Sequence, residues 1–143
     1  MVDGNVHLYL CCKPCHNSIR RAKTGSAGRE KSRMRAYLID EITASDLDNI
    51  KGFLENHAIK SNLDQIYWVQ MPDDLLTATQ LEHRDCRPHV FSVELGLSWV
   101  KLEFFIRSLT DMRCTCPGYC SPEQMNYIIA FSHSMIEQVG LRT

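Results

Sequence analysis

The chain has 143 residues, of which 44% are hydrophobic and 23% charged, and its formal net charge is −1. This length fits one domain, which can bury about two thirds of its unfolded surface. No apolar run approaches the roughly 20 residues that cross a bilayer, and the apolar stretch at 6–12 is too short for a secretory signal. We therefore expect a cytoplasmic protein without a membrane segment.

The charge is divided unevenly along the chain. Residues 1–35 hold eight basic and two acidic side chains, a net charge of +6, whereas the rest holds eight basic and fifteen acidic ones, a net charge of −7. Residues 24–28 are small and polar, as in a flexible linker. We predict a basic, disordered arm at 1–33 and a single α+β domain at 34–143. Alternatively, the first 33 residues are an extension that is not native.

The first part of the predicted domain shows a strand followed by a helix. Residues 36–42 are short and apolar, which indicates a strand, and Thr43 or Ser45 can cap a helix directly behind it. The apolar residues that follow lie at helical spacing on one face: Leu47, Ile50, Phe53, Leu54 and Ala58.

A second strand and a short helix are predicted next. Residues 65–70 are aromatic and β-branched and end before Pro72, which is typical of a strand. Asp73 or Asp74 can then cap a short helix over 75–81.

The clearest local pattern is a β-hairpin at residues 90–107. Phe91, Val93 and Leu95 alternate with polar residues, and the same alternation resumes from Val100 to Ile106 on the other side of Gly96. The sequence thus predicts two paired strands around a turn.

A long helix ends the chain. Ser121, Pro122 and Gln124 combine an N-cap, a proline at the first helical position and a capping box, so a helix should run to about Val139. The predicted fold class is α+β: a small mixed or antiparallel sheet of about four strands, packed against two or three helices.

Cysteine and histidine residues flank the predicted hairpin on both sides. An antiparallel hairpin returns the chain to its starting point, so groups before its first strand and after its second become neighbours. Six candidate metal ligands should therefore gather at one end of the hairpin: His83, Cys86, His89, Cys114, Cys116 and Cys120. If the chain is helical here, His83 and Cys86 share a face at i, i+3 spacing.

Our preferred ligand set is Cys86, Cys114, Cys116 and Cys120. A turn at Pro117-Gly118 would bring Cys120 back toward Cys116, and a position just before a helix favours a thiolate. His83 and His89 are then alternative ligands, or donors of hydrogen bonds to the bound thiolates.

Zinc is the expected metal, because four sulfur or nitrogen ligands in a tetrahedron are typical of structural zinc sites. The same cysteines could hold an iron–sulfur cluster in a redox or sensor protein. They could also be ordinary core residues, since a free cysteine packs as a small hydrophobic side chain.

A second cysteine group lies in the basic arm. Cys12, Cys15 and His16 follow the Cys-x-x-Cys-His pattern of c-type haem attachment, and with Cys11 they could instead form a second zinc site. The arm could alternatively bind nucleic acid, although no aromatic residue is interleaved with its basic residues.

Common catalytic motifs are absent from the sequence: there is no phosphate-binding glycine loop, no Gly-x-Ser-x-Gly and no His-Glu-x-x-His. A catalytic metal site would need an open coordination position, with Glu82 or Asp85 as a base. We predict a small metal-binding domain, and no recognised motif supports catalysis; its partner and oligomeric state are not specified by the sequence.

Overall fold

The structure is a computed structural model, and it describes residues 35–142. The predicted basic arm and its cysteines lie outside these residues. The elements follow one another as β1 (Ala36–Ile39), α1 (Ala44–His57), β2 (Ile59–Lys60), β3 (Ile66–Gln70), the 3-10 helix η3 (Asp73–Leu75), α2 (Ala78–Glu82), the 3-10 helix η4 (Arg84–Cys86), β4 (His89–Leu95), β5 (Val100–Glu103), β6 (Phe105–Ser108), β7 (Gly118–Tyr119) and α3 (Pro122–Val139).

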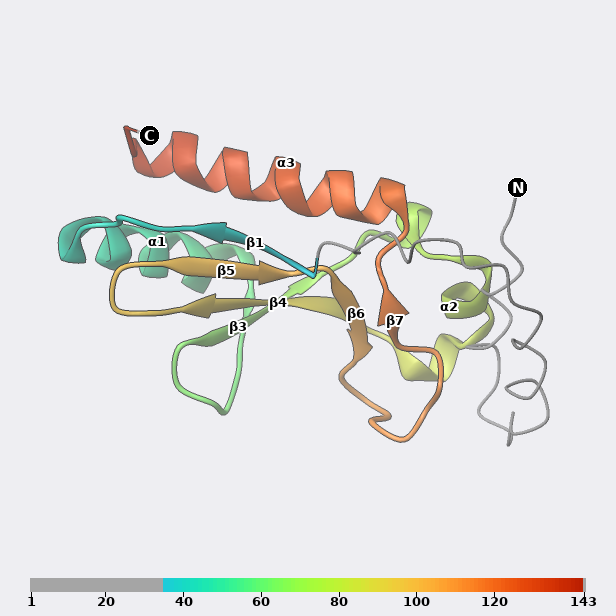
Figure 1. Cartoon of the computed structure of the whole chain (residues 1–143). Helices are drawn as coiled ribbons and strands as arrows, with labels where there is room; N and C mark the ends of the chain where they lie inside the picture. Colours follow the sequence, from blue (N-terminus) through green and yellow to red (C-terminus); the bar gives the residue numbers. More distant parts are fainter. Residues whose placement is uncertain (1–34, 143) are drawn as a thin grey trace, which may run out of the picture.

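An open antiparallel sheet of seven strands is the centre of the fold (Figure 1). The strand order is β1-β5-β4-β3-β2, and β6 extends the sheet by pairing with both β4 and β7. This confirms an α+β fold, but the sheet is larger than the four strands expected. Two of the additional strands, β2 and β7, have only two residues each, too few to show a periodic pattern.

The third additional strand arises because the second arm of the hairpin is interrupted at Phe104. Val93 pairs with Leu102, and Val90 pairs with Arg107. Between these two pairs β4 covers three positions, whereas the partner chain covers five. The backbone groups of Phe104 bond elsewhere: its N–H donates to Arg35 at 2.9 Å, and its carbonyl accepts from Cys120 at 3.1 Å. The interruption thus divides the arm into β5 and β6 while Phe104 remains buried in the core.

Both long helices begin where their caps predict. Thr43 accepts a hydrogen bond from the backbone N–H of Asp46 at the start of α1, and Ser121 and Gln124 form both bonds of a capping box at the start of α3. Helix α3 ends at Gly140, whose φ of 74° is the left-handed conformation that glycine adopts most readily. Among residues 35–142, no helix has the length and apolar character required for crossing a membrane.

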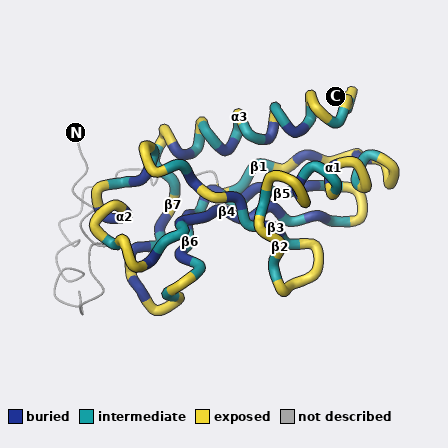
Figure 2. The backbone as a smooth tube through the Cα atoms, turned by 180° about the vertical axis from the view of Figure 1, so that it is seen from behind, coloured by how far each residue is buried: buried dark blue, intermediate teal, exposed yellow. Residues whose placement is uncertain are grey.

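The hydrophobic core lies between these helices and one face of the sheet. The ring of Phe131 in α3 contacts Phe53 of α1 and Phe91 of β4 at centroid distances of 5.9 and 5.7 Å. Buried positions are concentrated on the central strands (Figure 2). Helix α3 packs against this core through one face, on which Ile128, Ser132 and Met135 are all buried.

The short helix α2 begins later than the sequence suggested. Residues Asp73–Leu75 form only a 3-10 turn, and α2 starts at Ala78 because Thr77 and Gln80 make a complete capping box. Helix α2 ends at Glu82, so His83 is the first residue after the helix.

One buried amide joins the capping boxes of α2 and α3. The Nε2 atom of Gln124 donates to Oε1 of Gln80 at 2.8 Å and to the carbonyl of Leu75 at 3.0 Å, while its Oε1 accepts from the Ser121 N–H. Gln124 and Gln80 are almost fully buried. The bond therefore fixes the segment that carries His83 to the longest helix.

Replacing Gln124 with Ala should lower the free energy of unfolding by about 2 to 4 kcal/mol, because it leaves buried partners without hydrogen bonds. Urea denaturation measures this. The matched control is Gln138→Ala, on the exposed surface of the same helix, which should cost less than about 0.5 kcal/mol. Equal effects of the two substitutions would show that the buried bond does not hold α2.

Candidate metal centre

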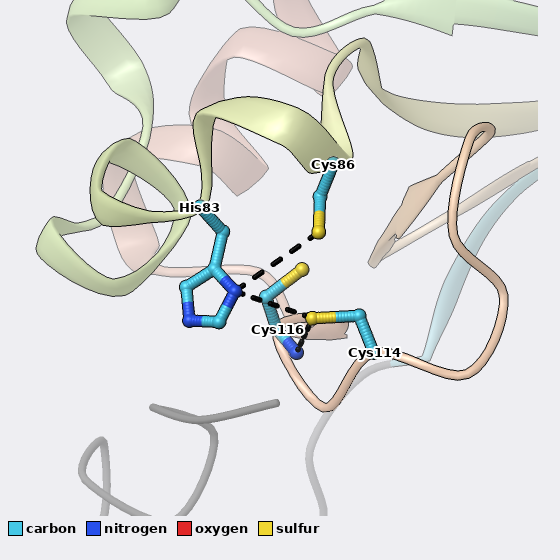
Figure 3. A group of neighbouring side chains, drawn as sticks. All are labelled: His83, Cys86, Cys114 and Cys116. Atoms are coloured by element: carbon cyan, nitrogen blue, oxygen red, sulfur yellow. Dashed lines mark hydrogen bonds between the residues drawn. The ribbon is translucent and has the colours of Figure 1, made fainter. Parts of the chain in front are cut away.

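Four side chains with metal-binding atoms gather between the turn after α2 and the loop that joins β6 to β7. These three elements lie at one end of the molecule (Figure 1). The four residues are His83, Cys86, Cys114 and Cys116, and one ligand atom from each lies within 4.8 Å of all the others. In Figure 3 the imidazole and the three sulfur atoms face a common centre. All three cysteines are buried, whereas His83 is half-buried.

The first two members come from the short turn between α2 and β4. His83 directly follows α2, and the backbone N–H of Cys86 donates to the His83 carbonyl at 3.1 Å. In a 3-10 turn, side chains at i and i+3 lie above one another. This geometry places the Cys86 sulfur 4.0 Å from Nδ1 of His83.

The other two members come from the loop that joins β6 to β7. Cys114 and Cys116 are two positions apart, and the backbone N–H of Cys116 donates to the Cys114 sulfur at 3.4 Å. The Cys114 sulfur also lies 3.2 Å from Nδ1 of His83, across 31 residues of chain.

Hydroxyl groups at the end of β6 hold the two segments together. Ser108 donates to the carbonyl of Cys86 at 2.5 Å. The Thr110 hydroxyl lies 3.1 Å from the carbonyls of both Asp85 and Arg87. Because β6 pairs with the first residues of β4, these bonds align the turn that carries His83 and Cys86 with the loop that carries Cys114 and Cys116.

His89 lies next to the group of four but is not one of its members. Its side chain is 1% exposed, and its Nε2 lies 3.6 Å from the sulfur of Cys116. Burial, followed by the nearby charges of Arg87 and His83, lowers the pKa of His89.

Cys120 lies outside the group of four. The turn expected at Pro117-Gly118 is replaced by strand β7, which starts at Gly118 and pairs with β6. The extended chain carries Cys120 away from Cys116, and its side chain packs against the main core instead. The structure therefore gathers His83 with three of the four cysteines of our preferred set.

The sulfur atom of Cys116 sits in an environment that favours the protonated thiol. Burial, together with hydrogen bonds to Cys114 and Cys86, raises the pKa of Cys116 well above its usual range. A bound dication reverses this preference, because a coordinating thiol loses its proton.

Comparisons with protein-family models, with curated proteins and with solved structures gave no match to this chain. The interpretation of the site therefore depends on its own geometry and chemistry.

The Cys120 thiol gives a test of burial outside the group. Burial raises its pKa to about 12, from 9.0 for an unperturbed thiol. Between pH 9.0 and about 12 the unfolded state releases a proton that the folded state retains, so the free energy of unfolding falls as the pH rises. The contribution of the protonated thiol to stability is therefore complete below pH 9.0 and is lost as the pH rises toward 12. At about pH 10 the loss should be roughly 1 kcal/mol.

Urea denaturation at about pH 8 and pH 10 checks this prediction. The wild-type protein should lose more stability between the two pH values than Cys120→Ala does. Tyr67 and Tyr127, whose pKa values are also raised by burial, titrate in both proteins and cancel in the comparison. The same pH dependence in both proteins would mean that the Cys120 thiol is not protected by folding.

Proposed function

We propose that residues 35–142 form a zinc-stabilised module, in which one ion bound by His83, Cys86, Cys114 and Cys116 fixes the β6–β7 loop to the turn after α2. The observation that carries the proposal is the convergence of four ligand atoms within 4.8 Å, from two segments far apart in the sequence.

The separations between the ligand atoms fit a single ion. With zinc–sulfur bonds of about 2.3 Å and zinc–nitrogen bonds of about 2.0 Å, tetrahedral geometry puts the ligand atoms roughly 3.5 to 3.8 Å apart. Nδ1 of His83 lies 3.2 and 4.0 Å from two of the sulfur atoms. An iron–sulfur cluster distributes its protein ligands over two or four irons, which requires wider spacing, so the geometry favours one ion.

The chemistry of the ligands favours zinc and a structural role. Three thiolates and one imidazole are among the sets that structural zinc sites use, and four protein ligands leave no position for a reacting water. Glu82 and Asp85, the candidate bases of a catalytic site, are both exposed. The absence of an open position supports a structural site over a catalytic one.

The loop between β6 and β7 is held to the turn after α2 by hydrogen bonds, but few of its apolar side chains are buried. Apart from the main core, the second buried cluster of the described residues contains only Cys86, Cys114 and Cys116. Of the two large apolar side chains in this loop, Met112 is 91% exposed and Leu109 is half-buried. Three thiols alone bury little apolar surface, whereas a bound zinc ion contributes its binding free energy directly to the folded state.

Full-length protein purified without air should contain about one zinc per chain at this site. Because the basic arm has its own candidate ligands, we would replace Cys12 and Cys15 with Ser in all variants compared. In this background Cys116→Ser and His83→Ala should each lower the bound zinc severalfold, as measured by elemental analysis.

Cys120→Ser is the matched control for the metal content. It removes a thiol four residues from Cys116 but outside the group, and should retain the full amount of zinc. Loss of zinc in this variant together with retention in His83→Ala would overturn the ligand set. Iron in place of zinc, or no metal at all, would overturn the proposed site.

Removing the metal should destabilise the domain, and the loss should begin locally. With free zinc at about 1,000 times its dissociation constant, binding contributes about 4 kcal/mol, which a chelator should remove. Amide hydrogen exchange should then accelerate first at residues 83–87 and 109–117, while α3 retains protection longer. Exchange unaltered by the chelator at both segments would contradict a structural role.

A further inference from the structure

The buried ring of His89 contacts the sulfur of Cys116 from the first residue of strand β4. The Nε2–Sγ distance of 3.6 Å suits a hydrogen bond to sulfur, which is larger than oxygen. The backbone of His89 is fixed, because it is paired with Ser108 and its carbonyl accepts from the N–H of Met71 at 2.9 Å, and the residue is 1% exposed. The contact is therefore built into the central sheet.

The surroundings of the ring determine which nitrogen carries the proton. A metal-bound thiolate can only accept, so Nε2 must donate to Cys116 once the metal is present. The other nitrogen, Nδ1, is buried and has no hydrogen-bond partner among the described residues. A buried nitrogen lone pair without a donor costs less free energy than a buried N–H without an acceptor. A proton on Nε2, which has the Cys116 sulfur as a partner, is therefore favoured over a proton on Nδ1.

We propose that His89 is a positioning residue of the metal centre, whose Nε2–H group donates to the Cys116 thiolate and holds it on the ion. This inference rests on the proposed zinc site. It separates the two histidines by role: His83 binds the metal, and His89 supports a ligand.

The charge of the centre explains why such a donor is useful. Three thiolates around a divalent ion leave a net charge of −1 in a buried site, and hydrogen bonds to sulfur spread that charge. The Cys114 sulfur likewise accepts a hydrogen bond, from the backbone N–H of Cys116 at 3.4 Å. Cys116 is the most buried of the three cysteines, so its donor must come from the protein.

Two substitutions of similar size separate the hydrogen bond from packing. His89→Leu fills the space without a donor, whereas His89→Gln keeps an N–H close to the position of Nε2. In the full chain with Cys12 and Cys15 replaced by Ser, His89→Leu should bind zinc roughly 10 to 100 times more weakly, and His89→Gln should restore most of the affinity.

The cobalt-substituted protein gives a readout that packing alone would not alter. Without the hydrogen bond the Cys116 thiolate holds its electrons less tightly, so the sulfur-to-cobalt charge-transfer band should move to longer wavelength in His89→Leu and return in His89→Gln. Wild-type affinity and band position in His89→Leu would overturn the proposal for His89 while leaving the zinc site intact. Failure of the unmodified chain to bind zinc or cobalt would instead overturn the proposed function.

A measurement on the unmodified side chain covers the case in which His89→Leu does not fold. In protein loaded with ¹¹³Cd, NMR should detect coupling between the metal and the Nε2 proton of His89, transmitted through the Cys116 sulfur. A ring protonated only on Nδ1, or an Nε2 proton without any coupling to cadmium, would overturn the proposal.

Discussion

The pairing of β4 with β6 is the constraint on which the candidate metal centre depends. His89 lies opposite Ser108, so the chain entering β4 and the chain leaving β6 run side by side at one end of the sheet. His83 and Cys86 precede the first of these points, and Cys114 and Cys116 follow the second. The Ser108 hydroxyl donates a hydrogen bond to the Cys86 carbonyl, which fixes the turn before β4 to the end of β6.

The interruption at Phe104 makes this pairing possible. Strand β5 pairs with the far end of β4, and the two additional residues in the partner chain let β6 resume pairing near His89. Because Arg35 and Cys120 satisfy the backbone of Phe104, the interruption also ties β1 and the start of α3 to the same end of the sheet. Phe104 thus joins Arg35, which precedes β1, to Cys120, which precedes α3.

Local patterns in the sequence were sufficient for the long elements and for the neighbourhood of the site. The caps at Thr43 and Ser121 and the alternation on both sides of Gly96 have strong local causes, and each produced the expected element. The hairpin predicted from the sequence likewise places His83, Cys86, Cys114 and Cys116 in one region. What local patterns could not reveal was tertiary: a two-residue strand such as β7 forms only because β6 offers it a partner.

The same limit explains why the sequence alone favours Cys120 as a member of the group. Cys120 precedes a helix, a favourable place for a thiolate, but β7 extends the chain between Cys116 and Cys120 and directs Cys120 to the main core. His83 joins the group because the 3-10 turn after α2 aligns it with Cys86, as their i, i+3 spacing predicts for a helical chain. The role proposed for His89 similarly follows from its strand register, which its sequence neighbours do not show.

The central claim is that one ion is held by three sulfur atoms and one nitrogen. X-ray absorption at the metal edge tests it most directly, on full-length protein with Cys12 and Cys15 replaced by Ser. The expected spectrum has a zinc edge, three sulfur scatterers at about 2.3 Å and one nitrogen at about 2.0 Å, with no second metal nearby. Four sulfur scatterers, or an iron edge with metal–metal scattering, would contradict the account.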